Sequence, residues 1–364
     1  MIRVLQVVTQ MNRGGLETML MNYHRNIDRK QVQFDYLVHR KTPGLYDEEI
    51  ISLGGKIYRL PNLNPFSITY RKEIDKFFKE HPEYTIVHSH INCLSAIPLF
   101  YARKNGVKVR VSHSHISDNQ KLSLKNLIKL YYRNKLPLFT TKQFACGQRA
   151  GKWLYQNDNF EVIPNAIDAK RFRYNPDLAN KMKKELGLEN QFVIGHVGRF
   201  NIQKNQIFIV SIFGEILKSY PESKLILVGD GEEKKKISEK VAEMGIKEKV
   251  EFLGIRADVE NVMQAMDVFL MPSLFEGLPV TMIEAQASGL PCVISECVSS
   301  ECIITEHVKV CSLKKSKEEW AEVVLSYLGQ DRQDSYQKII DAKYDIEENA
   351  KYLQEFYLHE SGTK

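Results

Sequence analysis

The chain has 364 residues, of which 43% are hydrophobic and 26% charged, and its net charge is +6 at pH 7. This length exceeds one ordinary hydrophobic core and predicts two domains. The longest apolar runs fall far short of the roughly 20 residues that a membrane-spanning helix needs, and no cleavage site for secretion follows the opening MIRVLQVV. These features exclude an integral membrane protein, and we expect a cytoplasmic one.

Positive charge is concentrated in the first half. Residues 1–168 carry 25 Lys and Arg against 14 Asp and Glu, and the remainder carries 26 against 31, so the two parts have net charges of +11 and −5. Such a basic half favours a phosphate-rich ligand or an anionic surface as partner, although solvated charge explains any single cluster equally well. Nucleic acid is the weaker explanation, because no recognised binding motif accompanies the charge.

Strands and helices alternate through the first half. The strand-like runs are Arg3–Val8, Phe34–His39, Lys56–Leu60, Ile86–His90, Val107–His113 and Gln143–Cys146. Helical patterns lie between them at Glu17–Asn26, Tyr70–Glu80 and Leu94–Lys104. Short β-branched strands separated by helices predict βαβ units and a parallel sheet.

A pair of glycines, Gly14 and Gly15, follows Arg13 and the first predicted strand. Adjacent glycines let the backbone approach a phosphate or an acceptor closely. The motif is common before helices, but its place at the carboxyl end of a strand favours a ligand site, so Gly15 is a candidate donor-binding residue. The G-x-G-x-x-G pattern of dehydrogenases is missing here and at Gly229–Lys234.

Two His-Ser-His pairs end neighbouring predicted strands, at His88 and His90 and at His113 and His115. Residues two apart share a face of a strand, so each pair can direct two imidazoles to one point. Four histidines could bind zinc, and plain packing is a second alternative, but we expect no metal.

Residues 119–144 read NQKLSLKNLIKLYYRNKLPLFTTKQF, a cationic amphipathic pattern. Such a segment suits anionic lipid headgroups or a lipid-diphosphate acceptor. A helix that packs its apolar face on the core explains the pattern slightly better, and both can hold together.

The second half repeats the alternation of strands and helices. Its predicted elements are Phe192–Val197, Gln206–Ser219, Lys224–Val228, Glu232–Met244, Val250–Leu253, Val259–Met266, Val268–Met271, Thr281–Ser288 and Pro291–Ile294. No Gly/Ser-rich linker separates the halves. We therefore predict domains over residues 1–165 and 166–344, with a C-terminal helix of about 345–360 that packs back on the first domain and is capped by Asp345.

A turn with two cations, Gly198-Arg199-Phe-Asn-Ile-Gln-Lys204, ends the first strand of this half. Arg199 and Lys204 are spaced to reach one diphosphate, although ordinary surface charge is the simpler alternative. Another strand-end cation, Arg256, follows Gly254 and Ile255, and an arginine without a ligand is an equal alternative there.

Two carboxylates, Glu276 and Glu284, flank the turn in FEGLPVTMIEAQASGLP. Pro279 suits the first position of a short helix, whose free amides and dipole at Gly277 and Leu278 favour an anion such as phosphate. Because carboxylates accept hydrogen bonds from vicinal hydroxyls, one could hold a ribose and the other a sugar. That is the order of groups in a nucleoside diphosphate sugar.

Six cysteines (93, 146, 292, 297, 302 and 311) match no C-x-x-C pattern. Four of them lie near His307, but their spacing fits no zinc motif. We expect reduced thiols packed as small hydrophobes.

With these motifs the chain resembles the family-4 retaining glycosyltransferases of GT-B fold, especially the bacterial capsular and exopolysaccharide members. The resemblance covers nearly the whole chain, through VLQVVTQMNRGGLETML, VIPNAID, HVGRFNIQKNQ, LVGDGEE, VEFLGIRADV and FEGLPVTMIEAQASGLP. It implies an α/β fold of two Rossmann-like doubly wound domains facing a central cleft, with the acceptor on the first domain and the donor on the second.

The resemblance also implies roles for individual residues. Arg199 and Lys204 neutralise the departing diphosphate without a metal or other cofactor, and the donor, by analogy a UDP-sugar, is a substrate. Glu284 holds the ribose and Glu276 the sugar hydroxyls, while His90 lies near the transferred sugar. The backbone around Arg256 meets the nucleobase. Where family members carry Gly after the lysine this chain has Asn205, which weakens the match.

Three rival functions are open. A nucleotide-sugar epimerase of the same architecture would need an acid/base pair. A catalytically silent subunit that binds nucleotide sugar is disfavoured by the intact set of charged residues. A dehydrogenase is disfavoured by the missing glycine pattern. The sequence leaves the sugar, the linkage and the acceptor open, with a lipid-linked saccharide as the expected acceptor.

Overall fold

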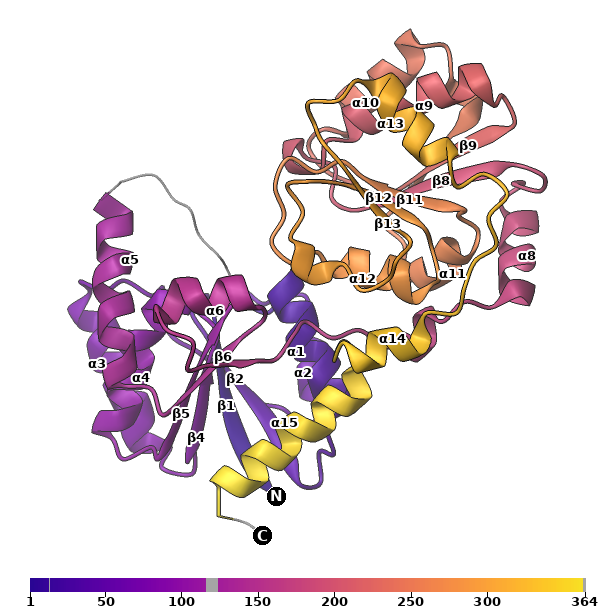
Figure 1. The fold of residues 1–364 in the computed structure, drawn as a ribbon. Coiled ribbons are helices and arrows are strands. Elements are labelled where there is room, and N and C mark those ends of the chain that lie inside the picture. The colour runs from indigo at the N-terminus through magenta and orange to yellow at the C-terminus, as the bar shows by residue number, and fades with distance from the viewer. Residues whose placement is uncertain (13, 116–123, 363–364) are drawn as a thin grey trace. The chain divides into compact units, whose positions relative to one another are not determined.

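The computed structural model describes residues 1–12, 14–115 and 124–362 (Figure 1). The chain divides into two compact units. Unit 1 comprises Met1–Ala166 together with the chain from Asp345 onward, and unit 2 comprises Ile167–Tyr344. No helix in the described parts of the chain is long and apolar enough to cross a membrane.

The sheet of unit 1 has seven parallel strands among the described residues, in the order β3-β2-β1-β4-β5-β6-β7. They are β1 (Ile2–Val8), β2 (Val32–Val38), β3 (Ile57–Arg59), β4 (Ile86–Ser89), β5 (Val109–Ser114), β6 (Lys142–Ala145) and β7 (Glu161–Val162). Residues of both faces are buried along β1 and β2, which explains their nearly continuous apolar sequences.

Helices cover both faces of this sheet. They are α1 (Gly15–Asn26), α2 (Asp47–Ser52), α3 (Ile68–Glu80), η1 (Asn92–Ser95), α4 (Ala96–Lys104), α5 (Leu124–Lys135), η2 (Leu136–Leu138), α6 (Gln148–Tyr155) and α15 (Ile346–Glu360). One core layer joins the sheet to α1 and α15, and the other joins it to α3, α4 and α6. The C-terminal α15, yellow in Figure 1, packs beside α1.

Unit 2 has six parallel strands within its described residues, in the order β10-β9-β8-β11-β12-β13. They are β8 (Phe192–Val197), β9 (Ser223–Val228), β10 (Val250–Gly254), β11 (Val268–Met271), β12 (Cys292–Ser295) and β13 (Val308–Cys311). Counted within the unit this is the doubly wound order 3-2-1-4-5-6 of Rossmann folds, whose ligands bind where the order reverses, at the carboxyl ends of the first and fourth strands. In unit 2 these are β8 and β11, and in unit 1 they are β1 and β4.

The helices of unit 2 also lie in two layers. They are α7 (Ala169–Phe172), α8 (Pro176–Glu185), η3 (Ile202–Lys204), α9 (Gln206–Ser219), α10 (Lys234–Glu243), η4 (Lys247–Lys249), α11 (Val259–Gln264), α12 (Val280–Ala287), η5 (Ser300–Cys302), α13 (Lys317–Leu325) and α14 (Tyr336–Asp341).

Most predicted elements form, with small shifts at their ends. The helix expected over Leu94–Lys104 is a 3₁₀ turn followed by α4, because Pro98 lacks the amide that a continuous helix would need there. The C-terminal helix begins as predicted, since the Asp345 carboxylate accepts from the amides of Glu347 and Glu348.

Candidate active site

The predicted cation turn lies at the carboxyl end of β8, the first strand of unit 2. The chain leaves β8 at Val197 and turns through Gly198 and Arg199 into η3. Asn201 caps this short helix, because its Oδ1 accepts from the Lys204 amide at 3.0 Å. The turn therefore has a fixed backbone on both sides of Arg199.

Asn205, the departure from the family pattern, has the conformation that a glycine would supply. Its φ of 59° and ψ of 41° are left-handed, a region that Asn tolerates better than most residues. Its side-chain Nδ2 donates to the Pro272 carbonyl at 3.1 Å, which a glycine could not do. The replacement thus keeps the turn and adds a bond to the loop after β11.

Two further hydrogen bonds join the same two loops. The Leu274 amide donates to the Gln203 carbonyl at 2.8 Å, and Gln203 Nε2 donates to the Phe275 carbonyl at 3.0 Å. The Glu276 amide donates to the Cys297 carbonyl at 3.1 Å. The loop that carries Glu276 is therefore held against the turn that carries Lys204.

Lys204 and Glu276, predicted separately, meet in one ion pair. Lys204 Nζ lies 2.7 Å from Glu276 Oε1, and the side chains are only 15% and 8% exposed. The angles are not those of a hydrogen bond, so Oε1 has no hydrogen-bond partner among the described residues although it is buried. The pair places a cation and a carboxylate with spare acceptor capacity at the point where the strand order reverses.

Arg199 pairs with a residue that the sequence analysis did not assign. Its guanidinium donates to Glu232 Oε2 at 3.0 and 3.2 Å, but the side chains are 71% and 55% exposed, so the pair is weak. Glu232 reaches it because Gly229, with φ 135°, packs against Gly198, where a Cβ would lie 2.0 Å from the Gly198 oxygen. This close approach explains the glycine in LVGDGEE.

Two buried residues support the cation turn from below. Gln206 Nε2 donates to the Arg199 carbonyl at 2.9 Å and lies 3.2 Å from His196 Nε2. His196 Nδ1 lies 2.9 Å from the Leu270 carbonyl, and burial lowers the pKa of this histidine to about 4. His196 is therefore a neutral hydrogen-bonding group that links β8 to β11. No sequence pattern marks this role, because His196 lies inside an apolar strand and Gln206 begins an apolar helix.

The turn before α12 is arranged nearly as predicted. Pro279 is the residue before the helix and not its first residue, with φ −73° and ψ 114°, and no side chain caps the helix. Gly277 is exposed, and Leu278 is half-buried. The helix thus begins with backbone amides available to an anion.

Glu284 lies half-buried in α12, and its carboxylate has no hydrogen bond or ion pair among the described residues. Burial raises the pKa of its carboxyl group to about 7, with repulsion from Glu260 as a smaller cause. Arg171, whose guanidinium lies 2.6 Å from Glu260 Oε1, lowers the same pKa. The carboxylate therefore has acceptor capacity that no described residue uses.

This pKa predicts how Glu284 affects stability. Because the folded-state pKa is raised above the ordinary 4.5, folding favours the protonated form, and that stability is lost as the pH rises through about 7. Glu284→Gln should raise the free energy of unfolding at pH 8 by at most about 3 kcal/mol, with little change at pH 4. Urea unfolding at both pH values measures this, with the exposed Glu239→Gln as control. Equal effects at the two pH values would contradict it.

Arg256 pairs locally. Its guanidinium donates to both carboxylate oxygens of Asp258 at 2.8 and 2.6 Å. Any contact of this arginine with a ligand would have to compete with that bidentate pair. The backbone at Gly254 is bonded as well, since its carbonyl accepts from the Gly229 amide at 2.8 Å.

In unit 1, Gly15 is the first residue of α1, the first helix after β1, and a Cβ added to Gly15 would meet nothing within 4 Å. Gly14 precedes the helix without a side-chain cap. Arg13 lies outside the described residues. The location at a strand's carboxyl end and a helix start is that of an anion or acceptor site.

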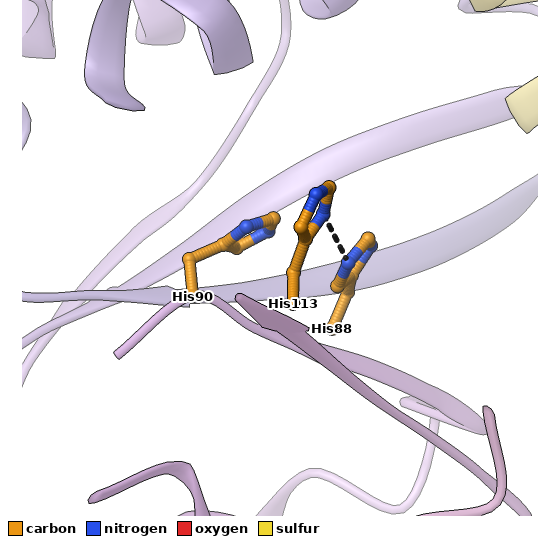
Figure 2. A group of neighbouring side chains, drawn as sticks. All are labelled: His88, His90 and His113. Atoms are coloured by element: carbon orange, nitrogen blue, oxygen red, sulfur yellow. Dashed lines mark hydrogen bonds between the residues drawn. The ribbon is translucent and has the colours of Figure 1, made fainter. Parts of the chain in front are cut away.

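The histidines of β4 and β5 form one buried cluster. Figure 2 shows His88, His90 and His113 with their rings side by side, and a nitrogen of each lies within 4.8 Å of the others. Within each pair, ring centroids are 4.2 Å apart, so the two histidines share a face as predicted. His90 lies 2.8 Å from Gln6 Oε1 and 3.0 Å from His115.

These nitrogens could in principle hold a metal ion, but protein groups already occupy most of them. His88 Nδ1 lies 2.6 Å from the Tyr357 hydroxyl and His113 Nδ1 lies 3.2 Å from His88 Nε2. A metal would have to displace these hydrogen bonds.

Of the six cysteines five are buried, as expected of packed thiols, but Cys297 is exposed, because it lies in the turn after β12.

The described part of the basic segment is α5 and the chain after it, since residues 116–123 lie outside the described residues. Leu136 is fully buried, as packing on the core predicts, but Leu127, Tyr131 and Leu138 are 53%, 58% and 57% exposed. The helix thus carries apolar side chains on its exposed surface beside its cations.

Family models match almost the whole chain. Residues 13–171 match the model "Glycosyltransferase Family 4", and residues 179–346 match "Glycosyl transferases group 1". EpsF of Bacillus subtilis is 37% identical over 340 residues, which are 88% of this chain and 86% of that one. The "Capsular polysaccharide biosynthesis glycosyltransferase CapH" of Staphylococcus aureus is 25% identical over 98% of this chain and 99% of its own.

Solved structures of similar fold cover both units. The Anabaena protein Alr3699/HepE in complex with UDP has a TM-score of 0.80 at 20% identity and covers 98% of this chain and 99% of its own. Sucrose-phosphate synthase of Thermosynechococcus elongatus has a TM-score of 0.77 at 16% identity, over the full length of both chains. At these identities the likeness shows the fold, and the predicted GT-B fold of two Rossmann-like domains is confirmed.

Proposed function

Because the chain belongs to the family-4, group 1 glycosyltransferases, we propose that it transfers a sugar from a nucleotide sugar, with UDP as the nucleotide, to an acceptor hydroxyl and retains the anomeric configuration. The observation that carries this proposal is the buried pair of Lys204 and Glu276 beside the uncapped start of α12. A cation and free amides suit a diphosphate, and the carboxylate suits sugar hydroxyls.

The donor would lie in unit 2. Lys204, Arg199 and the amides at Gly277 and Leu278 would stabilise the leaving diphosphate, with Pro279 shaping the turn. Glu232 would leave Arg199 when the diphosphate arrives, because the exposed pair is weak.

The rest of the donor would be held at the flanks of the diphosphate. Glu284 would accept from the ribose hydroxyls, and Glu276 from the sugar hydroxyls. The backbone around Arg256 would meet the nucleobase. From unit 1, Gly15 would contribute to binding of the transferred sugar and the acceptor, and His90 would lie near that sugar.

The chemistry we propose has no covalent intermediate. The bond from the anomeric carbon to the diphosphate oxygen breaks, the acceptor oxygen bonds to the same face of that carbon, and the acceptor proton passes to the departing phosphate oxygen. Lys204 and Arg199 make the leaving group stable by neutralising its charge. Trapping of a glycosyl group on Glu276 would contradict this mechanism.

The reaction as proposed needs no metal, since these two cations and the helix amides supply the positive charge. Turnover should therefore survive treatment with EDTA. Loss of turnover that Mg²⁺ or Mn²⁺ restores would contradict it.

For the acceptor we propose a lipid-linked saccharide in capsular or exopolysaccharide synthesis. CapH is named for capsular polysaccharide biosynthesis. A relative in Escherichia coli, 32% identical over 58% of this chain, is named as a galactosyltransferase that acts on a diphosphoundecaprenol-linked GlcNAc. The exposed Leu127 and Tyr131 on the cationic α5 support peripheral contact with an anionic membrane. Cosedimentation with anionic vesicles, and its absence with neutral ones, tests that contact.

The rivals make different products. An epimerase would convert the donor without any acceptor, and a silent subunit would bind the donor without turnover. Incubation with the donor alone, followed by analysis of the sugar, separates them from a transferase. Epimerised donor would overturn the proposal.

The test of the donor is a screen of nucleotide sugars for thermal stabilisation. At 100 times its dissociation constant a bound donor adds about 2.7 kcal/mol, which raises the melting temperature by roughly 5–10 °C for a unit of this size. We expect UDP and one or a few UDP-sugars to stabilise, and the corresponding GDP-sugars not to. Stabilisation by none of them would contradict the assignment.

A further inference from the structure

The four histidines of unit 1, His88, His90, His113 and His115, belong to a hydrogen-bonded relay that reaches the C-terminal helix. In its first arm, His115 Nε2 lies 3.0 Å from His90 Nδ1, and His90 Nε2 lies 2.8 Å from Gln6 Oε1. Gln6 lies on β1, so this arm crosses from β5 through β4 to the first strand.

The second arm begins at the nitrogen of the Gln6 side-chain amide. Gln6 Nε2 donates to the Tyr357 hydroxyl at 3.4 Å, and that oxygen lies 2.6 Å from His88 Nδ1. His88 Nε2 lies 3.2 Å from His113 Nδ1, the bond drawn in Figure 2. Tyr357, on α15, thus joins the two arms to each other.

Elementary hydrogen-bond chemistry gives the relay a direction. Gln6 Oε1 can only accept, so His90 Nε2 carries the hydrogen and His90 Nδ1 is left as an acceptor. His115 Nε2 must then be the donor to it. His115 therefore keeps a lone pair on Nδ1.

The same logic orders the second arm. Gln6 Nε2 can only donate, so the Tyr357 oxygen accepts from it and the hydroxyl hydrogen is left for His88 Nδ1, the other group that this oxygen contacts. His88 Nε2 then donates to His113 Nδ1. The remaining hydrogen lies on His113 Nε2. That nitrogen is buried and has no hydrogen-bond partner among the described residues.

The orientation of the Gln6 amide decides the direction of both arms. A flipped amide would reverse every bond, so this arrangement follows from Gln6 Oε1 facing His90 and Gln6 Nε2 facing Tyr357. Burial lowers the pKa of all four histidines, so each ring is neutral and carries one hydrogen. The relay therefore has one consistent arrangement.

His115 Nδ1 is the open end of this arrangement. The atom is buried, and it has no hydrogen-bond partner among the described residues. His115 is held at its backbone and at its ring, because its backbone amide donates to Asn92 Oδ1 at 3.0 Å and its ring Nε2 donates to His90 Nδ1. Donation from Nε2 polarises the ring and makes Nδ1 a stronger acceptor.

We propose that Gln6 and Tyr357 are positioning residues that hold all four rings as Nε2–H tautomers and thereby keep His115 Nδ1 as an uncharged acceptor for a saccharide hydroxyl. The ligand in this inference rests on the proposed function, in which the acceptor binds unit 1. The tautomers do not depend on it. A group that accepts without a charge binds a hydroxyl over a wide pH range.

The direct test is the tautomeric state of the histidines in the full chain labelled with ¹⁵N-histidine. Two-bond ¹H–¹⁵N correlation spectra distinguish Nε2–H from Nδ1–H rings, and we expect His88, His90, His113 and His115 all to be Nε2–H and to stay so from pH 6 to 8. An Nδ1–H form or an imidazolium at any of the four would overturn the relay. This result does not depend on whether the protein transfers a sugar.

The second test removes one link. In Tyr357→Phe, His88 Nδ1 loses its donor, so the His88 and His113 signals should shift toward a mixture of tautomers. The KM for the acceptor should rise about tenfold, while the KM for the donor stays unchanged. Tyr36→Phe is the matched control, since Tyr36 is also fully buried in unit 1 and its hydroxyl lies 3.2 Å from His24 Nδ1, outside the relay.

Two outcomes of this comparison would overturn the proposal. One is unchanged histidine signals in Tyr357→Phe, and the other is an equal change in the acceptor KM for both variants. If no acceptor is turned over by any variant, the proposed function fails while the tautomer result still decides on the relay.

Zinc titration separates the relay from a metal centre. Zinc needs lone pairs that the relay occupies on His88, His90 and His113. We expect equimolar Zn²⁺ to leave their signals unchanged. Stoichiometric zinc binding that shifts these three would overturn the relay and make the cluster a metal site.

Discussion

Replacing Lys204 by alanine should lower kcat by about 10²–10³-fold, the cost of removing one preorganised electrostatic contact to developing charge. Lys204 is the buried cation of the site, held by a capped turn and paired with Glu276 at 2.7 Å. In low dielectric surroundings its effect on the leaving diphosphate is large. Initial rates of sugar transfer at saturating donor, divided by the folded fraction, measure the loss.

Two further variants are compared with Lys204→Ala. Arg199→Ala should cost less, on the order of 10- to 100-fold, because the Arg199 side chain is 71% exposed. Lys183→Ala is the control, since Lys183 pairs with Asp267 at 2.8 Å in a partly buried contact outside the site. It should lower stability and leave turnover unchanged. Normal turnover in Lys204→Ala would refute the role of this lysine.

The second large effect is expected for Glu276→Gln, which keeps the shape and removes the charge. Turnover should fall about 10²-fold, because sugar hydroxyls lose a charged acceptor in the transition state. UDP should bind at least as tightly, since Lys204 is released from its counter-ion. Calorimetric titration with UDP and initial rates measure the two quantities separately.

A carboxylate elsewhere in unit 2 provides the control for this variant. Glu215 is equally buried, with a side chain 9% exposed, and pairs with Lys218 and Lys317. Glu215→Gln should leave both UDP affinity and turnover unchanged. If Glu276→Gln weakened UDP binding and turnover by the same factor, Glu276 would be a structural partner of Lys204 and not a group that contacts the sugar.

The family resemblance and the two Rossmann-like sheets are confirmed. They could be predicted because the patterns that indicate them lie within single strands and helices. Continuous apolar strands such as β8 and β11, and long apolar helices such as α9, carry strong patterns, and these three elements have the predicted bounds. The two-residue β7 and the edge strand β13, with only Cys311 buried, were missed because they have too few buried positions to show a period.

The glycines, cations and carboxylates of the candidate site could also be predicted, since residues of these types at strand ends are recognisable in sequence. Their partners could not. These partners are Glu232, which pairs with Arg199, Gln203, which donates to the Phe275 carbonyl, and Gln206, which donates to the Arg199 carbonyl. No sequence periodicity predicts these three contacts. Asn205 is the clearest case, because it departs from the family pattern in sequence and yet occupies a left-handed position that suits Asn.

The contact that sequence reasoning was least able to predict is the hydrogen bond from Gln6 to Tyr357, which joins residues 351 positions apart. Neither residue belongs to a motif. Side chains that meet only through tertiary folding leave no trace in local spacing. The histidine pairs could therefore be predicted from sequence, but the direction of their hydrogen bonds could not.

The placement of α15 has a consequence for biosynthesis. Unit 1 is built from both ends of the chain, and Ile346, Ala350, Leu353 and Tyr357 belong to its buried core. A ribosome adding about 5–20 residues per second makes the whole of unit 2 before it reaches them, a delay of roughly 10–40 s. During that time the nascent first half has an uncovered apolar face, and it is the second half that can complete its fold first.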